Sequence, residues 1–460
     1  MLYFNKIRPL VIGMVHVHAL PGSPGNTLNM GRICGDVRTQ TLMYKSAGVD
    51  SILIENMNDL PYVQAKDMGP ETVAYMTSVG VIARKYFNDS SPFCQTQMLT
   101  NSLQILLKNL PKDVKESADN ATISKNFTGG EEVQTASFPN FKETGHGKTE
   151  SEARLKGILE IYANYLDKEK LISNEHKKMK DVRDEIQGAM HKFLRQNDIP
   201  YLGKLEKYCH RTKSSSKFAL DTLSNGLNEY PLYHGKLFID GKLAAETIEN
   251  KKDLAHKKCV NDYLRGKIGV QILAGANKEA LAVAHSADLD YIRAEGFVFS
   301  HVADEGWMDA CAGQLLRYRN YIGANNIQIF TDIKKKHSAH AVTSDVSLVE
   351  MAKAAEFFGS DGVIVTGTAT GEQTNPEHVQ DVISNVSVPV LVGSGVNSDN
   401  VADYKNASAV IVGSHFKRNQ DWRQRINIPR LYHFMVNIFS DEIDFDKVLE
   451  TDSDSDLDVR

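Results

Sequence analysis

Two short stretches late in the chain have the same form: PVLVGSGVNSDNV at Pro389–Val401 and AVIVGSHFK at Ala409–Lys417. In each stretch an apolar run ends abruptly at Gly-Ser. Continuous apolar runs are typical of strands that are buried on both faces of a parallel sheet covered by helices. Small residues at a strand end also let the backbone amides of the next loop approach a ligand closely. The two stretches therefore predict neighbouring parallel strands with similar loops.

The same alternation of strand and helix signals extends through the rest of the chain. Eight apolar runs are each followed by a helical stretch, and they lie at 11–15, 51–55, 268–273, 291–295, 327–331, 362–366, 390–392 and 409–412. Eight such units predict an α/β fold of the (β/α)8 or TIM-barrel class rather than an open sheet. Because the last two runs end in Gly-Ser, we expect a barrel of the phosphate-binding type.

A long segment, 88–266, separates the second run from the third. It is polar and rich in Ser, Thr and Asn from about 112 to 150, and a small strand pair is compatible with 234–254. We expect a mostly helical and partly disordered insertion between strands 2 and 3, on the side of the barrel away from the chemistry. The predicted organisation is barrel at 1–87, insertion at 88–266, barrel at 267–440 and an acidic disordered tail at 441–460.

Composition narrows the class of protein. The chain has 460 residues and a net charge of −5, with no clustered basic face, so nucleic acid is not expected as a partner. No apolar run reaches the roughly 18 residues of a membrane span. The first residues lack a signal or transit pattern, and five scattered cysteines suit a reducing compartment, which predicts a cytoplasmic protein. No cofactor is expected.

The loops after the strands of such a barrel meet at one face, where catalysis takes place. The two Gly-Ser stretches therefore predict a phosphate site held by backbone amides, hydroxyls and the N-termini of the following helices. Its residues are Gly393, Ser394, Gly395, Gly413 and Ser414. The alternative is that these glycines only end their strands.

The first strand ends in VHVHALPG, where His16 and His18 form a His-x-His pair. Metal-dependent hydrolase barrels begin in this way, but they need a histidine after strand six and a carboxylate after strand eight. Strand six ends TGTATGE and strand eight offers His415, so no metal is expected. We interpret one of the two histidines as an acid, a base or a phosphate donor.

The fifth strand ends in TDIKKKHSAH, where Asp332, Lys334 and Lys336 share a parity and can face one side. A buried carboxylate beside lysines can act as an acid, a base or a Schiff-base amine, and the alternative is a solvated basic loop. The D-x-K spacing is similar to that of the decarboxylase barrels for orotidine phosphate. An Arg293–Glu295 pair, or a ligand, would satisfy the polar residues on strand four.

Seven stretches together resemble the BtpA/SgcQ family, over residues 1–87 and 266–425: GMVHVHALPGSP, ILIENMNDLPY, YIRAEGFVFSHVADEGW, FTDIKKKHS, DGVIVTGTATGE, VLVGSGV and IVGSHFK. The resemblance implies a TIM barrel similar to phosphate-binding barrels. The family includes a cyanobacterial factor for photosystem I accumulation and a protein from a bacterial sugar-operon context, and no settled reaction comes with it. The segment 88–266 has no counterpart there. The resemblance places motif positions at His16, Glu55, Asn56, Asp59, Asp332, Lys336, His337, Thr366, Gly367, Gly393, Gly395 and Gly413.

From these observations we expect an enzyme, a lyase, isomerase or transferase, that acts on a small phosphorylated metabolite. The alternative is a non-catalytic assembly or stability factor, in which the insertion or the acidic tail binds a protein partner. A metal-dependent hydrolase is a third interpretation, and a homo-oligomer is compatible with any of them. The catalytic candidates are His16, Glu55, Asp332, Lys336 and His337. The ligand-binding candidates, besides the Gly-Ser residues, are Asn56, Asp59, Arg293, Thr366 and Gly367.

Overall fold

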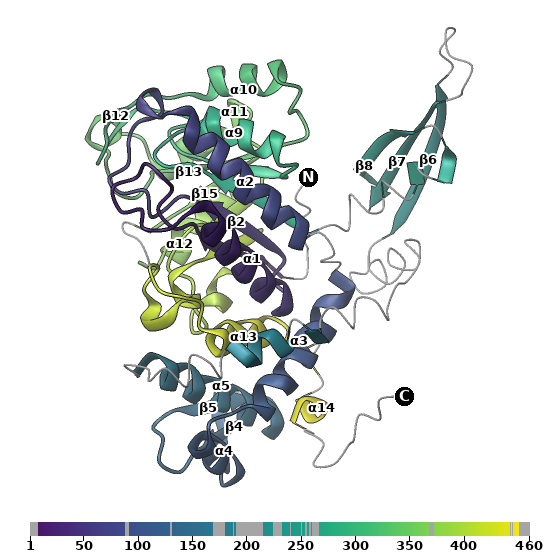
Figure 1. Cartoon of the computed structure of the whole chain (residues 1–460), viewed down its shortest axis with the longest axis vertical. Helices are drawn as coiled ribbons and strands as arrows, with labels where there is room; N and C mark the ends of the chain where they lie inside the picture. Colours follow the sequence, from purple (N-terminus) through teal and green to yellow (C-terminus); the bar gives the residue numbers. More distant parts are fainter. Residues whose placement is uncertain are drawn as a thin grey trace. The chain divides into compact units, whose positions relative to one another are not determined.

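The chain contains a closed barrel of eight parallel strands (Figure 1). The computed structural model describes residues 8–87, 92–128, 131–168, 180–186, 188–189, 215–223, 232–239, 241–249, 251–253, 255–256, 259, 266–367, 372–441, 443 and 445–449. The barrel strands are β1 (Leu10–His16), β2 (Ser51–Glu55), β9 (Lys267–Gln271), β10 (Tyr291–Ala294), β13 (Gln328–Ile333), β15 (Gly362–Val365), β16 (Val390–Val392) and β17 (Ala409–Val412). Spatial neighbours follow chain order, and β17 closes the barrel on β1. The predicted eight-stranded barrel is confirmed.

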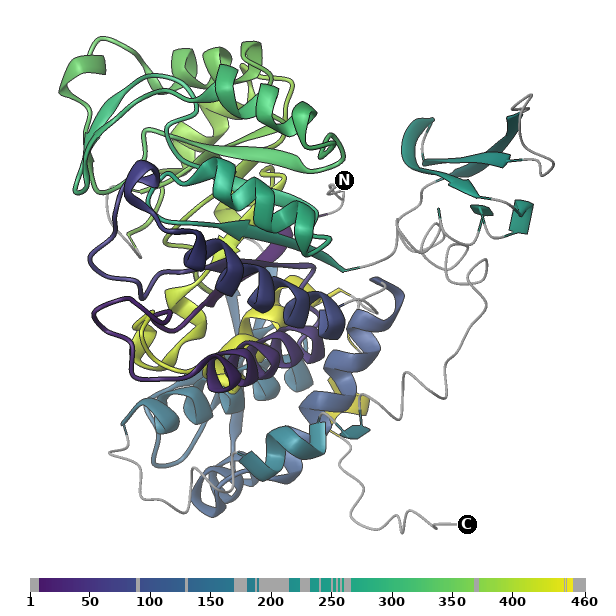
Figure 2. The same ribbon diagram turned by 45° about the horizontal axis from the view of Figure 1, so that its top comes forward.

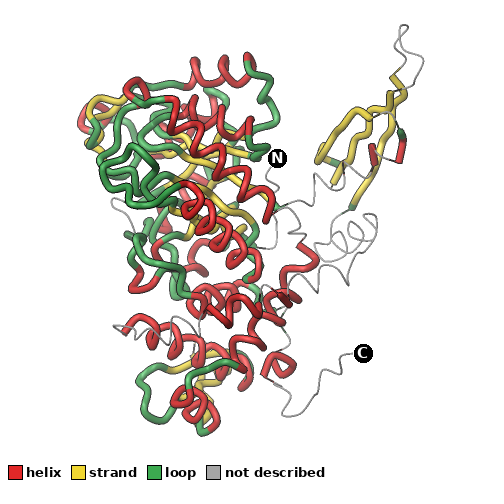
Figure 3. The backbone as a smooth tube through the Cα atoms, in the orientation of Figure 1, coloured by secondary structure: helices red, strands yellow, loops and turns green. Residues whose placement is uncertain are grey.

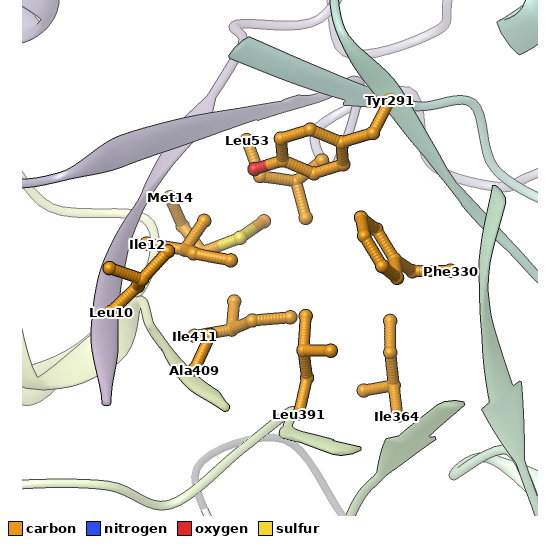
Figure 4. Packing of buried hydrophobic residues seen from close by; sticks show 10 residues of the cluster. All are labelled: Leu10, Ile12, Met14, Leu53, Tyr291, Phe330, Ile364, Leu391, Ala409 and Ile411. Atoms are coloured by element: carbon orange, nitrogen blue, oxygen red, sulfur yellow. The ribbon is translucent and has the colours of Figure 1, made fainter. Parts of the chain in front are cut away.

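Buried residues from every barrel strand except β9 pack together in the interior of the barrel (Figure 4). Tyr291 and Phe330 meet edge to face with ring centroids 5.5 Å apart. Tyr291 also occupies the space beside Gly269, where a Cβ atom would lie 2.1 Å from its ring. The phenol shares a hydrogen bond of 2.9 Å with the Ser51 hydroxyl, so its one polar group is satisfied. This packed layer sets which residues face inward at the strand ends.

Helices surround the strands, as Figures 1 and 2 show. Ser347 and Glu350 form a capping box at the start of α11, and Asn375 caps α12 ahead of a proline. A single turn of 3-10 helix, η3 (Val401–Tyr404), lies between β16 and β17, where a helical stretch was expected after the seventh apolar run. The helices that alternate with the barrel strands are α1 (Met30–Ser46), α2 (Pro70–Phe87), α9 (Asn277–Ser286), α10 (Ala312–Tyr321), α11 (Leu348–Phe357) and α12 (Pro376–Ile383).

Two loops at the carboxyl ends of the barrel strands build a small antiparallel sheet of their own. The loop after β10 forms the hairpin β11 (His301–Ala303) and β12 (Gly306–Met308), and β14 (Ser338–Ala339) from the loop after β13 pairs with β11. These strands have only two or three residues each. Such short pieces carry no periodicity of their own, which is why the sequence did not predict them.

The insertion between β2 and β9 differs from the prediction. Thr122–Gly147, expected to be partly disordered, form the antiparallel sheet β3 (Thr122–Thr128), β4 (Glu131–Ser137) and β5 (Thr144–Gly147), which packs on α5 (Glu150–Lys168) (Figure 3). Gly145 lies so close to α5 that a Cβ atom would be 1.9 Å from the Ala153 carbonyl oxygen. The strands of this sheet are mostly polar. They lack the apolar and β-branched runs by which a strand is recognised in a sequence. The remaining described elements before this sheet are α3 (Pro92–Lys108) and α4 (Lys112–Asp119).

A second three-stranded antiparallel sheet comes later in the insertion. It consists of β6 (Ser216–Leu223), β7 (Leu232–Ile239) and β8 (Lys242–Glu249). The strand pair expected at 234–254 is present as β7 and β8, with β6 as a third strand.

The chain divides into two compact units, and the division does not follow the predicted domains. One unit comprises Met1–Lys45, Val49–Phe93 and Ile199–Ser414, and the other Ser46–Gly48, Cys94–Asp198 and His415–Arg460. Helix α13 (Ile428–Ile438), expected to complete the barrel, thus belongs with α5 of the insertion.

Buried polar contacts explain that assignment. The Arg430 guanidinium pairs with Asp167, the Asn427 amide donates to the Ala163 carbonyl at 2.9 Å, and His433 Nδ1 lies 3.2 Å from Glu160 Oε2. The start of the acidic tail is also ordered, because α14 (Phe445–Leu449) buries Val448; residues 450–460 lie outside the described residues. No helix in the described part of the chain is long and apolar enough to span a membrane.

Candidate active site

The carboxyl end of the barrel, here called the mouth, is lined by the next inward-facing residue of each strand. On five strands this residue is large and polar: His16 on β1, Glu55 on β2, Gln271 on β9, Arg293 on β10 and Asp332 on β13, each at most 8% exposed. Parallel strands bring these residues to one level. On the last three strands the equivalent residues are small, namely Thr366, Gly393 and Gly413.

Arg293 and Asp332 form a two-point ion pair at the centre of this layer. The Arg293 Nε atom lies 3.0 Å from Asp332 Oδ2, and Nη2 lies 2.9 Å from Oδ1. The expected Arg293–Glu295 pair is not formed. Burial raises the pKa of Asp332, although the neighbouring Arg293 guanidinium acts in the opposite direction. The pair holds the guanidinium in one orientation, so it presents a fixed positive charge at the mouth.

A second buried pair joins the loops after β10 and β13. Lys335 Nζ lies 3.2 Å from Glu295 Oε2 and 3.7 Å from Glu305 Oε2. The sequence pattern placed Lys335 on the outer side, because Asp332, Lys334 and Lys336 share a parity. Strand β13 ends at Ile333, however, and Lys334 has a φ of 48°, which breaks the alternation and turns Lys335 inward.

Lys336 lies among the same groups, as its electrostatic neighbours show. Burial and the nearby Arg293 guanidinium lower the pKa of Lys336, against the opposing effect of Glu55 and Asp332. Within the described residues its amine makes no hydrogen bond or ion pair. A lysine in this setting has an amine that is available as a base or a nucleophile.

Glu55 is an electrostatic neighbour of Lys336, with no hydrogen bond or ion pair between them in the described structure. Burial raises the pKa of Glu55, with Arg293 and Lys336 acting against the shift. Its Oε2 atom lies 3.8 Å from His16 Nε2, so the two predicted catalytic residues at the ends of β1 and β2 do meet. A carboxyl group with a raised pKa beside an amine with a lowered pKa is the combination that acid–base catalysis uses. We call Glu55, Arg293, Glu295, Asp332, Lys335 and Lys336 the charged cluster.

Two predicted residues have other positions. His337 is exposed in the turn after Lys336, with a φ of 55°, and does not join the charged cluster. His18, the second histidine of the His-x-His pair, is 48% exposed at its side chain and lies 3.4 Å from Asp36. β1 ends at His16, so the shared parity of the two histidines has no structural consequence.

Asn56 and Asp59 organise loops. Asp59 accepts hydrogen bonds from the Leu20 amide and the Ser23 hydroxyl, both at 2.7 Å, and from the Asn56 amide at 3.0 Å. Asn56 also accepts from the Leu273 amide at 2.8 Å. These bonds tie the loops after β1, β2 and β9 together and occupy the groups that were predicted to bind a ligand.

The loop after β16 is also engaged with its neighbours. The Ser394 hydroxyl accepts from the Gly367 amide at 2.9 Å and donates to the Glu372 carbonyl at 3.2 Å. Gly395 has a φ of 71°, and a Cβ atom there would lie 2.2 Å from the Glu372 carbonyl oxygen and 2.3 Å from Gln373 Cα. This Gly-Ser-Gly stretch packs against the 372–374 segment, which accounts for its small residues without a ligand.

The expected helix N-termini are not present at this position. β16 is followed by η3, and β17 by η4 (Ser414–Phe416), each a single turn of 3-10 helix. Phosphate binding by Gly393, Ser394, Gly395, Gly413 and Ser414 stays a prediction, and it has less support from the structure than from the sequence. Thr368 and Thr370 lie outside the described residues.

Comparison with known proteins places this barrel in a family. The sequence profile of the BtpA family matches residues 7–91 and 256–439. These two ranges lie on either side of the insertion and together cover more than half of the chain. The chain belongs to the BtpA family.

Two relatives differ in how much of the chain they match. A Caenorhabditis elegans protein, described as mitochondrial and otherwise uncharacterised, is 51% identical over 434 residues, which is 94% of each chain. The photosystem I biogenesis protein BtpA of Synechocystis is 29% identical over 36% of this chain and 58% of its own length. A match to the YdjI aldolase of Escherichia coli has 15% identity, a TM-score of 0.22, and covers 37% of this chain and 64% of that one.

The C. elegans relative corrects one prediction. A cytoplasmic location was expected from the N-terminal sequence and the scattered cysteines, and the description of this relative as mitochondrial contradicts it. The insertion is shared with this relative, because the alignment covers 94% of both chains.

Two polar residues of this BtpA-family site were not singled out by sequence reasoning. Gln271 is 2% exposed, and its Oε1 atom has no hydrogen-bond partner within the described structure. Lys335 was not selected because the parity argument placed it on the outer side of the strand. A glutamine at the end of an otherwise apolar strand is a detectable signal for Gln271. Thr366, which was predicted, has a buried Oγ1 atom that is likewise unpartnered among the described residues.

Proposed function

We propose that this BtpA-family barrel is an enzyme, a lyase, isomerase or transferase, that acts on a small phosphorylated carbonyl compound. The observation that carries the proposal is Lys336, an amine with a lowered pKa that lies beside two carboxyl groups with raised pKa values, Glu55 and Asp332. A structural core has no need of such groups, because burying them costs several kcal/mol of stability. Their retention at the mouth supports a chemical role.

The chemistry follows from the groups present. The neutral Lys336 amine adds to a carbonyl carbon, a C–N bond forms, and a proton moves from the nitrogen to the carbonyl oxygen, which becomes a hydroxyl group. Glu55 then gives its proton to that hydroxyl, which leaves as water, and a protonated imine remains opposite the Glu55 carboxylate. The Arg293 guanidinium, fixed by Asp332, stabilises negative charge that develops on the substrate oxygen. Hydrolysis of the protonated imine by the reverse steps returns the proton to Glu55, and His16 lies 3.8 Å from that carboxylate.

The test uses the full chain and does not require the substrate to be identified in advance. A thermal-shift screen against phosphorylated aldehydes and ketones first finds ligands, because a ligand at 100 times its Kd adds about 2.7 kcal/mol of stability. Each hit is then treated with sodium borohydride, which reduces an imine to a stable secondary amine. Peptide mass spectrometry locates the adduct, and we expect it on Lys336.

Lys336→Met should abolish the adduct, and Lys353→Met, at an exposed lysine of α11, should not change it. Turnover without an adduct would mean that Lys336 acts as a base that abstracts a proton and does not form an imine. Ligand binding with neither turnover nor adduct would contradict the enzymatic proposal.

The alternative function is a non-catalytic assembly or stability factor. Its support is the role in photosystem I biogenesis that the name of the Synechocystis relative states, together with an insertion that adds two sheets to the chain. Under this hypothesis, Lys336→Met has no effect on the phenotype of a cell that lacks the native protein, whereas removal of β6–β8 does. The enzymatic proposal predicts the reverse pattern.

We also infer a mitochondrial location, which rests on the C. elegans relative. Fluorescence microscopy of the chain with a C-terminal tag, expressed in a eukaryotic cell, should show overlap with a mitochondrial marker.

A further inference from the structure

A small pocket lies beside the charged cluster, on the side of β10 and β13. Its lining residues are Gly296 and 298–301 from the loop after β10, Asp332, Lys334, Lys335, His340 and Thr343 from β13 and the following loop, and Met351. Asp332 belongs both to this wall and to the ion pair with Arg293, so the pocket adjoins the groups that carry the proposed chemistry. It lies on the strands opposite the Gly-Ser loops in barrel order.

Two histidines of the pocket have unsatisfied ring nitrogens. His301 is 4% exposed, and its Nε2 atom is buried with no partner in the described structure. Its hydrogen bond to the Phe299 backbone is therefore made by Nδ1. His340 Nε2 lies 2.8 Å from the Lys335 carbonyl oxygen, and its buried Nδ1 atom is the unpartnered one. The ring centroids are 5.5 Å apart.

Each ring thus donates one N–H to the backbone, which leaves two buried nitrogens available to a ligand. A buried polar atom without a partner costs stability and calls for an explanation. Burial, Lys335 and His340 lower the pKa of His301 to about 4. Without a ligand, this ring is neutral near pH 7.

The charges around the two rings decide which ligand fits. Lys334 and Lys335 are in the pocket wall, and Lys335 lies between Glu295 and Glu305. The carboxylate in the pocket wall, Asp332, is occupied by Arg293. A metal ion in this pocket would be repelled by the positive charges of the two lysines. The described residues also contain no group of three His, Cys, Asp or Glu side chains that could hold a metal ion. Lys335 is already paired with Glu295 and Glu305, so an anion meets the charge of Lys334, and it favours protonation of both rings.

We propose that this pocket binds the phosphate group of the substrate, held by His301, His340 and Lys334. The proposal rests on the proposed function and places the anchoring site beside β10 and β13, away from the Gly-Ser loops. Each histidine then donates to a phosphate oxygen from the nitrogen that is unpartnered in the free protein. The rest of the substrate extends past Asp332 toward Arg293 and Lys336.

Isothermal titration calorimetry of the full chain with sulfate and with inorganic phosphate tests this. Sulfate keeps its charge between pH 5.5 and 8, so any pH dependence of its binding belongs to the protein. We expect binding to tighten as the pH falls, with proton uptake visible as a dependence of the heat on the buffer. His301→Asn should weaken sulfate binding at least tenfold, whereas His378→Asn, at an exposed histidine of α12, should not change it.

A second measurement tests the proposal even if His301→Asn fails to fold. In the parent protein, 15N spectra of the imidazole nitrogens should show His301 and His340 becoming protonated when sulfate is added at pH 6.5. Unchanged rings, or binding that is lost in Ser414→Ala and kept in His301→Asn, would overturn the proposal in favour of the Gly-Ser loops. Zinc bound in place of the anion and lost in His301→Asn would also overturn it.

Lys336→Met separates this proposal from the proposed function. The variant should bind sulfate as tightly as the parent, because it lacks only the reacting amine. An imine on Lys336 without an anion site at His301 would leave the enzymatic proposal standing and remove this one.

Discussion

On one side of the barrel mouth, β1, β2, β10 and β13 end in His16, Glu55, Arg293 and Asp332. On the other side, β16 and β17 end in Gly393 and Gly413. The glycines accommodate the charged side: a Cβ atom at Gly393 would lie 3.5 Å from Arg293 Nη2, and one at Gly413 would lie 3.3 Å from His16 Cε1. The two sides are complementary, since long side chains from one reach over small residues of the other.

This difference changes the interpretation of the repeated Gly-Ser stretches. A repeated small-residue strand end is compatible with a phosphate loop, and it is equally required where a charged side chain crosses the mouth. Gly395 and Ser394 pack against the 372–374 segment, and unpartnered groups with positive neighbours lie instead beside β10 and β13. We therefore assign packing to the glycine side and chemistry to the charged side.

The largest effect should come from separating the central ion pair. Arg293→Met leaves the Asp332 carboxylate buried without its partner, which should cost about 3–5 kcal/mol of unfolding free energy. Denaturant titration measures it. The double variant Arg293→Met/Asp332→Leu should recover most of the loss, because neither charge is then buried alone.

The matched control is an exposed pair, Arg423 and Asp421, whose atoms lie 2.9 Å apart. Arg423→Met should change stability little, because water screens that pair. Equal losses at Arg293 and Arg423 would mean that burial does not distinguish the charged cluster.

The two Gly-Ser stretches should respond differently to alanine. Gly395→Ala forces a Cβ atom onto the Glu372 and Gln373 backbone at a φ of 71°, and should cost at least about 2 kcal/mol. Gly413→Ala meets His16 and Met14 at 3.3 Å and should cost roughly 1 kcal/mol or less, while displacing His16. Thermal unfolding of the two variants gives the comparison. If Gly395→Ala is as mild as Gly413→Ala, the loop after β16 is not held by packing.

A smaller effect concerns the pH dependence of stability. The pKa of Lys336 is lower in the folded protein than in the unfolded chain, where it is about 10.4. Between these two values the unfolded chain binds more protons, so stability gains from this group as the pH rises through that window. Lys336→Met should remove this gain and be at least as stable as the parent at pH 7. Chemical denaturation at pH 7 and pH 9.5 checks the sign; a larger gain in the variant would contradict the assignment.

The barrel was predictable because each of its strands is a short apolar run, and the strand bounds are correct to within two residues. Polar residues at the ends of apolar strands also indicated His16, Glu55 and Arg293 as site residues, and shared parity indicated Asp332, Lys334 and Lys336. That argument holds only while the backbone alternates. It failed after Ile333, where the positive φ of Lys334 turns Lys335 inward, although parity had placed Lys335 on the outer side.

The insertion was less predictable for a different reason. Sheet β3–β5 is polar along most of its length and depends on α5 for its packing, so its composition resembles that of a disordered segment. Helix α13 reads from the sequence as the last helix of the barrel, yet its polar residues Asn427, Arg430 and His433 are partnered by α5. Long-range pairing of this kind leaves no local pattern. The predicted ranges place α5 in the insertion and α13 in the barrel, whereas the two helices belong to one compact unit.

The most direct test of the central claim is the titration of the Lys336 amine. Competitive labelling of the full chain with acetic anhydride, at pH values from 6 to 11, reports the unprotonated fraction of each lysine by peptide mass spectrometry. The account predicts that Lys336 reaches half of its maximal reactivity at a lower pH than Lys353, whose side chain is exposed to solvent. In Glu55→Gln the midpoint should fall further, because the carboxyl group that favours the ammonium form is removed. A midpoint for Lys336 at or above that of Lys353 would contradict the claim that the charged side of the mouth is built for chemistry.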